Sequence, residues 1–406
     1  MPASALHRTY AKLLSCNPFG RTLVQQANVA ALRLTDSERT ILVSANSCWN
    51  IVNFRPGLIR ALQRRGYRIV VAAPDDECRS KLADLEVDFV PVPINSPGIS
   101  VLEDLRVLVR YVQVFRQVKP FAFLGFTAKP NIYGSLAAWI VGANVINNVS
   151  GLGTVFIKRG PLTALVTQLY RIAFGRSSTI FFQNRDDLEL FVRKRIARAD
   201  QAQLLPGSGV DLERFKPRPA VTAPDGAFRF LMVGRLLWDK GVAEYVEAAR
   251  IVRRSYPGAR FQMLGSIGAN NRTAVPSSLV ERWQAETIIE HLGERDDVRE
   301  AMEHADCIVL PSYREGLPRA LLEGSAMGKP LIATDVPGCR EVVVHGQTGY
   351  LCEERSTSAL SAAMLKMLET PAAQRQRMGK LGRRKVELEF CESRVISKYL
   401  NALEVP

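Results

Sequence analysis

Short apolar runs alternate with longer amphipathic stretches along most of this chain, starting at Thr40. Short apolar runs bounded by polar residues or glycine predict buried strands, while a repeat near 3.6 residues predicts helices. Alternation of this kind indicates parallel sheets with both faces covered, so the predicted fold class is α/β. In the first half we expect helices over 57–65 and 102–118, and strands over 40–44, 67–72, 89–92, 121–126, 144–148, 179–183 and 202–205.

Residues 206–228 interrupt this alternation, because they hold four prolines and three glycines with little periodicity. The alternation restarts at Arg229. We therefore expect two doubly wound, Rossmann-like domains that face each other across a cleft, with the active site in that cleft. The predicted organisation is an extension at 1–39, a first domain at 40–206, a linker at 207–228, a second domain at 229–385 and a C-terminal segment at 386–406, with a helix-like pattern over 385–403.

Two glutamates eight positions apart, Glu315 and Glu323, form the most specific pattern in the chain. An apolar run over 307–310 precedes them, so we expect Glu315 in a strand-to-helix loop and Glu323 about two turns into the helix. Loops at the carboxyl ends of parallel strands are where open α/β sheets bind ligands. Carboxylates placed there can accept hydrogen bonds from sugar and ribose hydroxyls, whereas two solvated helix glutamates are the ordinary alternative.

A second pattern lies upstream, where an apolar run ends in Gly234-Arg235 and Lys240-Gly241 opens a helix-like run. Arg235 and Lys240 can both face a diphosphate near a helix N-terminus, where free amides and the helix dipole favour anions. Arginine suits phosphate through its planar fork, and lysine acts as a point charge. Two surface cations are the alternative interpretation.

Together the two patterns resemble the nucleotide-sugar half of the family-four retaining glycosyltransferases, which have the GT-B fold. The resemblance covers roughly residues 40–390 and is most specific in the carboxyl half. In this family the last helix crosses back onto the first domain, and the resemblance implies the same for 386–406. Further matching segments are 292–298, 305–312, 328–334, 336–341 and 346–350.

The resemblance implies a role for each donor-side residue. Arg235 and Lys240, close to Gly234, neutralise the donor diphosphate, whose charge grows in the transition state. Glu315 contacts the transferred sugar, and Glu323 takes the ribose hydroxyls. The remaining donor contacts are made by backbone, near the base at Arg295 and Val298 and near the diphosphate at Gly316 and Leu317.

The first domain is implied to hold the acceptor. Its segment 46–56 lacks the Gly-Gly loop of many relatives and is similar to the branch that acts on polyprenyl-diphosphate-linked saccharides, where a His/Asn-Phe-Arg segment occupies this place. Arg55 can reach a phosphate, with a surface arginine as the alternative. Lys129 is the only ionisable group where mannosyl-transferring relatives often have a histidine. The other candidate acceptor contacts, whose amides are also common turn formers, are Asn53, Asn148 and Asn184.

Composition and charge suit a soluble enzyme with an anionic partner. Hydrophobic residues make up 47% and charged residues 23% of the chain, and the net charge is +14. Seven scattered cysteines without a Cys-x-x-Cys pair argue against a disulfide framework or a zinc site and fit a reducing cytoplasm. No nucleic-acid-binding motif accompanies the charge, so we expect no nucleic acid partner. Residues 1–39 are expected to be a loosely attached tail, with a transit peptide or an amphipathic surface segment as alternatives.

Two segments bear on membrane contact. Residues 130–157 carry no charge, but asparagines and glycines interrupt them, so we expect a buried helix, a strand and a glycine loop rather than a membrane span. Residues 153–200 hold nine Lys/Arg against four acids, with apolar residues at helical spacing over 162–174. This pattern favours peripheral contact with an anionic membrane surface, and a solvated helix face is the alternative.

The predicted chemistry is a metal-independent sugar transfer without a cofactor, with the nucleotide sugar as substrate. The chain contains no Asp-x-Asp, the motif that usually carries a metal on the diphosphate, and no evident nucleophile–base pair. The resemblance implies retention by same-face displacement. The predicted function is transfer of an N-acetylhexosamine from a UDP donor onto a polyprenyl-diphosphate-linked acceptor in bacterial polysaccharide synthesis, at the inner face of the cell membrane. A nucleotide-sugar epimerase and a non-catalytic binding module are the alternatives.

Overall fold

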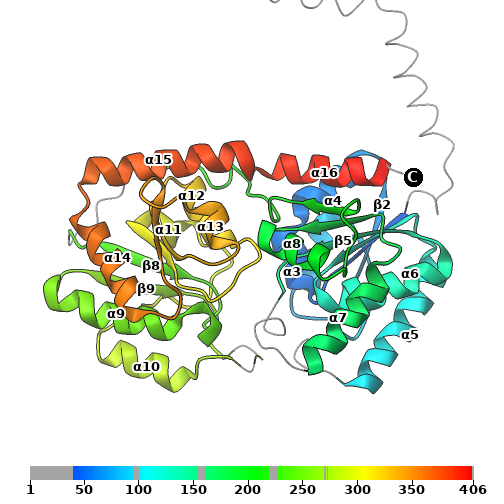
Figure 1. The fold of residues 1–406 in the computed structure, drawn as a ribbon, viewed down its shortest axis with the longest axis horizontal. Helices are drawn as coiled ribbons and strands as arrows, with labels where there is room; N and C mark the ends of the chain where they lie inside the picture. The colour runs from blue at the N-terminus through cyan, green and yellow to red at the C-terminus, as the bar shows by residue number, and fades with distance from the viewer. Residues whose placement is uncertain are drawn as a thin grey trace, which may run out of the picture.

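Two parallel β-sheets, each flanked by helices, organise the chain (Figure 1). Three predicted regions lie outside the described residues: the extension at 1–39, residues 219–225 of the linker, and residues 153–160, which include Gly153, Lys158 and Arg159. The computed structural model describes residues 40–94, 100–152, 161–218, 226–268, 271 and 273–404, and every structural statement below refers to these.

The first sheet has seven strands in the order β3-β2-β1-β4-β5-β6-β7, and each neighbouring pair is parallel. The strand order reverses between β1 and β4, which is the kind of place where doubly wound sheets form a ligand crevice. The strands are β1 (Thr40–Ser44), β2 (Arg68–Ala73), β3 (Asp88–Pro91), β4 (Ala122–Phe126), β5 (Asn144–Val149), β6 (Thr179–Phe182) and β7 (Ala202–Leu204). The helical elements are α3 (Cys48–Phe54), α4 (Pro56–Arg64), η1 (Arg79–Leu85), α5 (Val101–Val118), η2 (Pro130–Gly134), α6 (Ser135–Val141), α7 (Pro161–Phe174) and α8 (Arg185–Arg193).

The second sheet has six parallel strands in the order β10-β9-β8-β11-β12-β13, and its order reverses between β8 and β11. The predicted pair of doubly wound, Rossmann-like domains is therefore confirmed. The strands are β8 (Arg229–Val233), β9 (Arg260–Leu264), β10 (Glu290–His291), β11 (Cys307–Leu310), β12 (Leu331–Thr334) and β13 (Gly349–Cys352). The helical elements are η4 (Trp238–Lys240), α9 (Val242–Ser255), α10 (Ser277–Ala285), α11 (Arg299–His304), α12 (Arg319–Ala326), α13 (Cys339–Val342), α14 (Thr357–Glu369), α15 (Ala372–Glu389) and α16 (Glu392–Glu404).

Each sheet is buried on both faces, which explains why its strands are continuous apolar runs rather than alternating ones. In β8, Phe230 belongs to the core on one face and Leu231 to the core on the other. In β1, Leu42 and Ile41 divide between two cores in the same way. Burying one such side chain contributes about 1.5–3 kcal/mol, so the two-sided packing is what fixes strands that carry the site at their ends.

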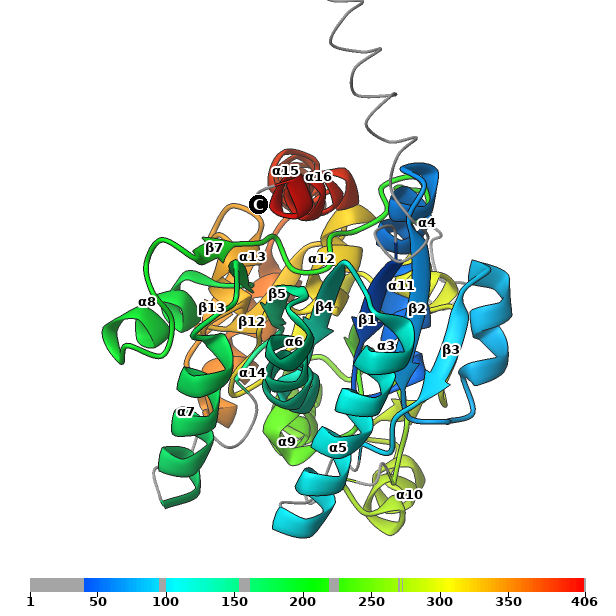
Figure 2. The ribbon, with the colours of Figure 1, turned by 90° about the vertical axis from the view of Figure 1, so that its right-hand side faces the viewer.

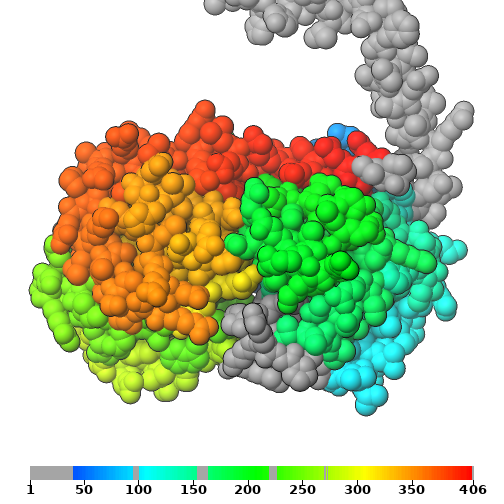
Figure 3. Space-filling view, viewed as in Figure 1, coloured from blue at the N-terminus to red at the C-terminus, as the bar shows by residue number. Residues whose placement is uncertain are grey.

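The expected single helix over 385–403 is instead two helices, α15 and α16, which meet at a break near Phe390. At the break the backbone hydrogen-bonds with Val210, in the segment that follows the first sheet. Val210 N donates to Phe390 O at 3.0 Å, and Glu392 N donates to Val210 O at 3.2 Å. These bonds to another segment replace the helical ones. The two helices run across both domains (Figures 1 and 3).

Helix α16 packs on the first sheet, although it is far in sequence from the strands of that sheet. The ring of Tyr399 is fully buried against Phe126 and Phe181, and its hydroxyl accepts a hydrogen bond from Asn148 at 2.8 Å. The last helix is thus part of the first domain's core and connects that core to α15.

The uncharged stretch 130–157 forms short elements, as expected. Its described part contains η2, α6 and β5, and most of their side chains are buried. None of the described helices combines the length and the apolar character that crossing a bilayer demands.

Candidate active site

The two glutamates lie where their spacing predicts. Strand β11 ends at Leu310 and α12 begins at Arg319, so Glu315 lies in the loop between them and Glu323 lies in the second turn of α12. Pro318 precedes the helix with an extended backbone at φ −74° and ψ 118°, which turns the chain into the first helical residue. This loop extends from the carboxyl end of a central strand, next to the reversal in strand order.

Lys240 and Glu315 form an ion pair, with Lys240 Nζ 2.5 Å from Glu315 Oε1. Lys240 ends η4, and the following residue, Gly241, has φ 75°. A side chain at Gly241 would place its Cβ 2.1 Å from Pro311 O, so glycine allows the two loops to approach. This cation and this carboxylate, expected to contact different parts of the donor, form a pair with each other in the structure.

Arg235 differs from Lys240 in its surroundings. It follows β8 and is exposed, and within the described part of the chain its guanidinium makes no ion pair or hydrogen bond. Gly234 has φ 147° and packs against Gly265, because a Cβ built at Gly265 would lie 2.0 Å from Gly234 O. Two closely packed glycines therefore set the direction in which Arg235 leaves the sheet.

Glu323 is 8% exposed and is bound by Arg319, whose Nε and Nη2 lie 2.9 and 2.7 Å from Glu323 Oε1. Arg319 also reaches the first domain, where its Nη1 donates to Asn53 O at 3.3 Å and its guanidinium lies 5.2 Å from the Phe54 ring centroid. Sequence reasoning missed Arg319. Its four-residue spacing from Glu323 is a pairing signal on a helix and could have identified it.

The loop expected near the nucleotide base is ordered by surface ion pairs. Arg295 is exposed and its Nη1 lies 2.8 Å from Glu300 Oε2, while Val298 precedes α11 and packs at the edge of a core. Between them, Asp296 pairs with Lys81 of η1 at 2.9 Å. The loop therefore touches the first domain across the cleft.

Arg55 is buried, so the alternative of a surface arginine is wrong. Its guanidinium carbon lies 4.0 Å from the Phe126 ring centroid, next to Tyr399, and burial lowers its pKa to about 10. Asn53 lies in α3, where its Nδ2 donates to Trp49 O at 3.0 Å. Arg55 thus lies in the contact between the first sheet and α16.

Lys129 is not the lone ionisable group that the sequence indicated. Its Nζ lies 2.8 Å from Asp104 Oδ1, and both side chains are largely buried. Asp104 comes from α5, twenty-five positions upstream, so spacing gave no signal for the pair. Burial and the nearby Asp104 also raise the pKa of Tyr133. The structure therefore places Lys129 in an internal ion pair beside a buried tyrosine.

Asn148 and Asn184, two of the candidate acceptor contacts, are also internal. Asn148 is fully buried and bonds with Tyr399, Ser150 and Gln183. Asn184 is 1% exposed, and its Nδ2 donates to Gly316 O of the second domain at 2.9 Å. Neither side chain is oriented toward open solvent.

The loops of the two domains meet at Gly316. A Cβ built there would lie 2.0 Å from Ser150 O, and a Cβ at Gly151 would lie 3.2 Å from Gly316 N. Leu317 is 7% exposed and packs against Gly207. The structure thus joins Gly316 directly to the loop after β5 and Leu317 to the segment after β7.

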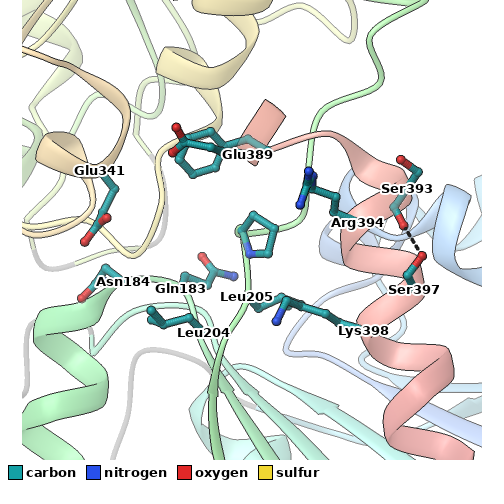
Figure 4. A pocket seen from close by; sticks show the side chains of 12 residues that line it. Gln183, Asn184, Leu204, Leu205, Glu341, Glu389, Ser393, Arg394, Ser397 and Lys398 are labelled. Carbon is teal, nitrogen blue, oxygen red and sulfur yellow. Dashed lines mark hydrogen bonds between the residues drawn. The ribbon is translucent and has the colours of Figure 1, made fainter. Parts of the chain in front are cut away.

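A pocket of about 590 Å³ lies beside this junction, where α15 and α16 meet. Arg394 and Lys398 extend into it from α16, opposite Asn184 and Glu341 (Figure 4). Glu315, Lys240 and Arg235 do not line it. In the part of the chain that the structure describes, no three His, Cys, Asp or Glu side chains gather in a way that could hold a metal ion.

Two family models match the chain on its two sheets. The model described as glycosyl transferases group 1 matches residues 213–385, and the model described as glycosyl transferase 4-like matches residues 40–184. The first match contains the Lys240–Glu315 pair and the glutamate spacing. The chain is a glycosyltransferase, and its second domain matches the group 1 glycosyl transferases. This confirms the predicted enzyme class and the predicted family.

Named relatives of this glycosyltransferase act on lipid-linked sugars. It is 27% identical over 335 residues to the N,N'-diacetylbacillosaminyl-diphospho-undecaprenol alpha-1,3-N-acetylgalactosaminyltransferase of Campylobacter jejuni, covering 79% of this chain and 87% of that one. It is 25% identical over 295 residues to the UDP-Gal:alpha-D-GlcNAc-diphosphoundecaprenol alpha-1,3-galactosyltransferase of Escherichia coli, covering 68% and 74%.

A solved structure confirms the fold. The crystal structure of the Anabaena protein HepE in complex with UDP matches this glycosyltransferase with a TM-score of 0.73 at 16% identity, covering 91% of this chain and 100% of that one. The predicted GT-B arrangement of two Rossmann-like domains is therefore correct.

Proposed function

We propose that this glycosyltransferase moves a sugar from a UDP donor, with an N-acetylhexosamine as the best candidate, onto a polyprenyl-diphosphate-linked saccharide in bacterial polysaccharide synthesis. The observation that carries the proposal is the Lys240–Glu315 pair after the carboxyl end of β11, with the exposed Arg235 at the end of the neighbouring strand β8. In a nucleotide sugar, one bond joins the phosphate to the transferred sugar. A cation that binds the phosphate and a carboxylate that binds the sugar therefore have to lie next to each other, as Lys240 and Glu315 do. Relatives that are named for undecaprenyl-linked acceptors support the acceptor class.

The proposed step needs no metal, because side chains supply the positive charge. Lys240 and Arg235 hold the diphosphate and offset the charge that builds on it as the bond to the sugar breaks. The acceptor hydroxyl attacks the anomeric carbon from the side that UDP leaves. Its proton passes to the departing phosphate oxygen, so the products are UDP and the extended saccharide with the anomeric configuration retained.

Glu315 has a separate role in this proposal. Its carboxylate accepts hydrogen bonds from hydroxyls of the transferred sugar, and the ion pair with Lys240 keeps it oriented next to the phosphate. Glu323 takes the ribose, with Arg319 fixing one of its oxygens. The backbone from Arg295 to Val298 receives the base.

We further propose that the first domain contacts an anionic membrane surface from the cytoplasmic side. The predicted apolar face of α7 is present, with Leu165 and Ile172 about half exposed, but α5 carries a larger one. Four aliphatic side chains of α5, each half or more exposed, are Val101, Leu102, Leu105 and Val109. In Figure 2, α5 and α7 project side by side from the first sheet, with α6 between them.

Positive charge accompanies these apolar faces, as binding to anionic lipid requires. A pocket of about 560 Å³ at the end of α7 is lined by Arg171, Arg195 and Arg198. Sedimentation with vesicles should show stronger binding to anionic than to neutral lipid. Leu102→Asp with Leu105→Asp should abolish that binding, and unchanged binding would contradict the membrane contact.

Transfer assays test the proposed function. The protein is incubated with UDP, GDP, ADP and dTDP sugars and with lipid-linked acceptors, and product is measured by mass spectrometry. Transfer from a UDP-N-acetylhexosamine is expected. A complete lack of transfer and of hydrolysis with every donor would overturn the proposal. NMR of the donor without acceptor separates out an epimerase, which would convert the free nucleotide sugar.

A further inference from the structure

The N-terminal end of α8 touches the loop that carries Glu315, although the two lie in different domains. Asn184 caps α8, since its Oδ1 accepts from Asp187 N at 2.8 Å. Its Nδ2 donates to Gly316 O at 2.9 Å and to Asp187 Oδ2 at 3.0 Å. One side chain therefore ties the helix end to the backbone next to Glu315.

Asp187 holds the same loop through a second contact. It is fully buried and forms an ion pair with Arg314, the residue directly before Glu315. Burial raises the pKa of Asp187, while Arg314 and Asn184 act against that rise. Keeping an ionised carboxylate in such a place costs desolvation energy that only well-placed partners offset.

The second domain holds the loop from the opposite side. Glu315 N donates to Pro337 O at 3.3 Å, and a Cβ at Gly338 would approach both Gly316 O and Glu315 O closely. The carboxylate itself is held by Lys240. The backbone between Arg314 and Gly316 is thus fixed by contacts from both domains at once.

We propose that Asp187 and Asn184 are positioning residues for transfer: through Arg314 and Gly316 they set the place of the Glu315 carboxylate when the two domains are together. The proposal rests on the proposed function, because it needs Glu315 to contact the transferred sugar. It adds that the acceptor-side domain helps to build the donor site. A displacement of about 1 Å at a reacting centre can cost a hundredfold in rate, so the effect is measurable.

A neighbouring ion pair provides the matched control. Asp186 and Arg340 also join α8 to the second domain, at 3.6 Å, but both are exposed by about two fifths and neither bonds to the Glu315 loop. Asp186→Asn and Asp187→Asn make the same chemical change at adjacent positions. Comparing them separates positioning of the loop from mere attachment of one domain to the other.

The experiment measures kcat, the KM for the donor, the Kd for UDP by calorimetry and the melting temperature. Asp187→Asn should lower kcat about 10–100-fold while the Kd for UDP changes less than threefold, because UDP binds the second domain. Asp186→Asn should stay within twofold of the wild type in all four quantities. Arg314→Gln combined with Asp187→Asn should lose little more than Asp187→Asn alone, since one pair is removed either way.

Asn184→Ser keeps the test decisive if Asp187→Asn does not fold. Serine still caps α8 but its shorter side chain does not reach Gly316 O, so kcat should fall with the helix intact. The proposal is overturned if both folded variants keep kcat within twofold, or if the loss of kcat follows an equal loss of UDP binding. A wild type that transfers from no donor would instead reject the proposed function, and the inference with it.

Discussion

The candidate residues of the two domains differ in what surrounds them. In the second domain, Lys240 and Glu315 are partly exposed and bind each other, and Arg235 is exposed without a partner in the described chain. In the first domain, Asn148 and Asn184 are buried and bound to internal partners. The same kind of pattern, polar residues after parallel strands, therefore has two outcomes.

This difference separates polar residues that remain available to bind a ligand from polar residues that hold the fold together. In the proposed function the donor diphosphate needs positive charge that stays available, and the second domain has Lys240 partly exposed and Arg235 exposed. The first domain uses its polar residues to join α16 and the Glu315 loop to its sheet. The residues that bind the acceptor are therefore not identified by their position in the chain alone.

The largest expected effect comes from the donor pair. Lys240→Ala should lower kcat about 10²–10³-fold and weaken UDP binding, because a charge-assisted contact to phosphate is lost. Glu315→Ala should lower kcat as strongly but leave the Kd for UDP nearly unchanged, since the carboxylate contacts the sugar. Transfer rates and calorimetry check both.

The control is Glu286→Ala, which removes the carboxylate of a surface ion pair with Arg250 in the same domain. It should leave kcat unchanged. Near-normal turnover in Lys240→Ala and Glu315→Ala would remove the contrast between the domains, because the exposed residues would then have no more function than the buried ones.

The contact between the domains should be nearly as sensitive. Gly316→Ala places a methyl group 2.0 Å from Ser150 O, so the loops must separate and kcat should fall about a hundredfold. Gly258→Ala is the matched control, because a Cβ there meets nothing within 4 Å. If Gly316→Ala behaves like Gly258→Ala in transfer assays, the two loops do not meet during the reaction.

A smaller effect on stability alone is expected in the first domain. Tyr399→Phe leaves Asn148 Nδ2 without its partner inside the core, which should cost about 1–3 kcal/mol of unfolding free energy. Thermal unfolding should show a melting temperature lower by several degrees, with the Kd for UDP unchanged. A variant that keeps full stability but loses transfer would mean that Asn148 takes part in acceptor binding after all.

The smallest expected effect is a pH dependence in the loop between Arg295 and Val298. Arg299 holds the pKa of Asp297 at about 2, below its usual 3.8. The carboxylate therefore stabilises the fold above about pH 4 and loses this contribution as the pH falls through 2. Asp297→Asn should lower the melting temperature slightly at pH 7, and its difference from the wild type should vanish between pH 4 and pH 2.

The control for this pH dependence is Asp200→Asn, which removes one carboxylate of an exposed pair with Arg198 in the first domain. Exposed pairs of this kind contribute little, so no melting difference is expected at any pH. An Asp297→Asn difference that persists at pH 2 would contradict the electrostatic explanation.

The sequence by itself determined the two-domain fold and the donor side of the site. Buried parallel strands are continuous apolar runs, and the loop carrying Glu315 lies within a few residues of its strand and its helix, so local spacing placed Glu315 and Glu323 correctly. The resemblance to the family-four retaining glycosyltransferases was recognisable for the same reason, because the matching motifs are short and continuous.

Only the tertiary structure decided which residues act together across the domains. Asp187 meets Arg314 across the domains, and Lys129 meets Asp104 within the first domain, although nothing in their spacing indicates either pair. The break between α15 and α16 also depends on a distant segment, because Val210 bonds to the backbone on both sides of it. The spacing of residues determines local structure over a few residues. Burial and charge pairing depend on contacts between segments that are distant in sequence, and these contacts form only when the sheets and helices pack together.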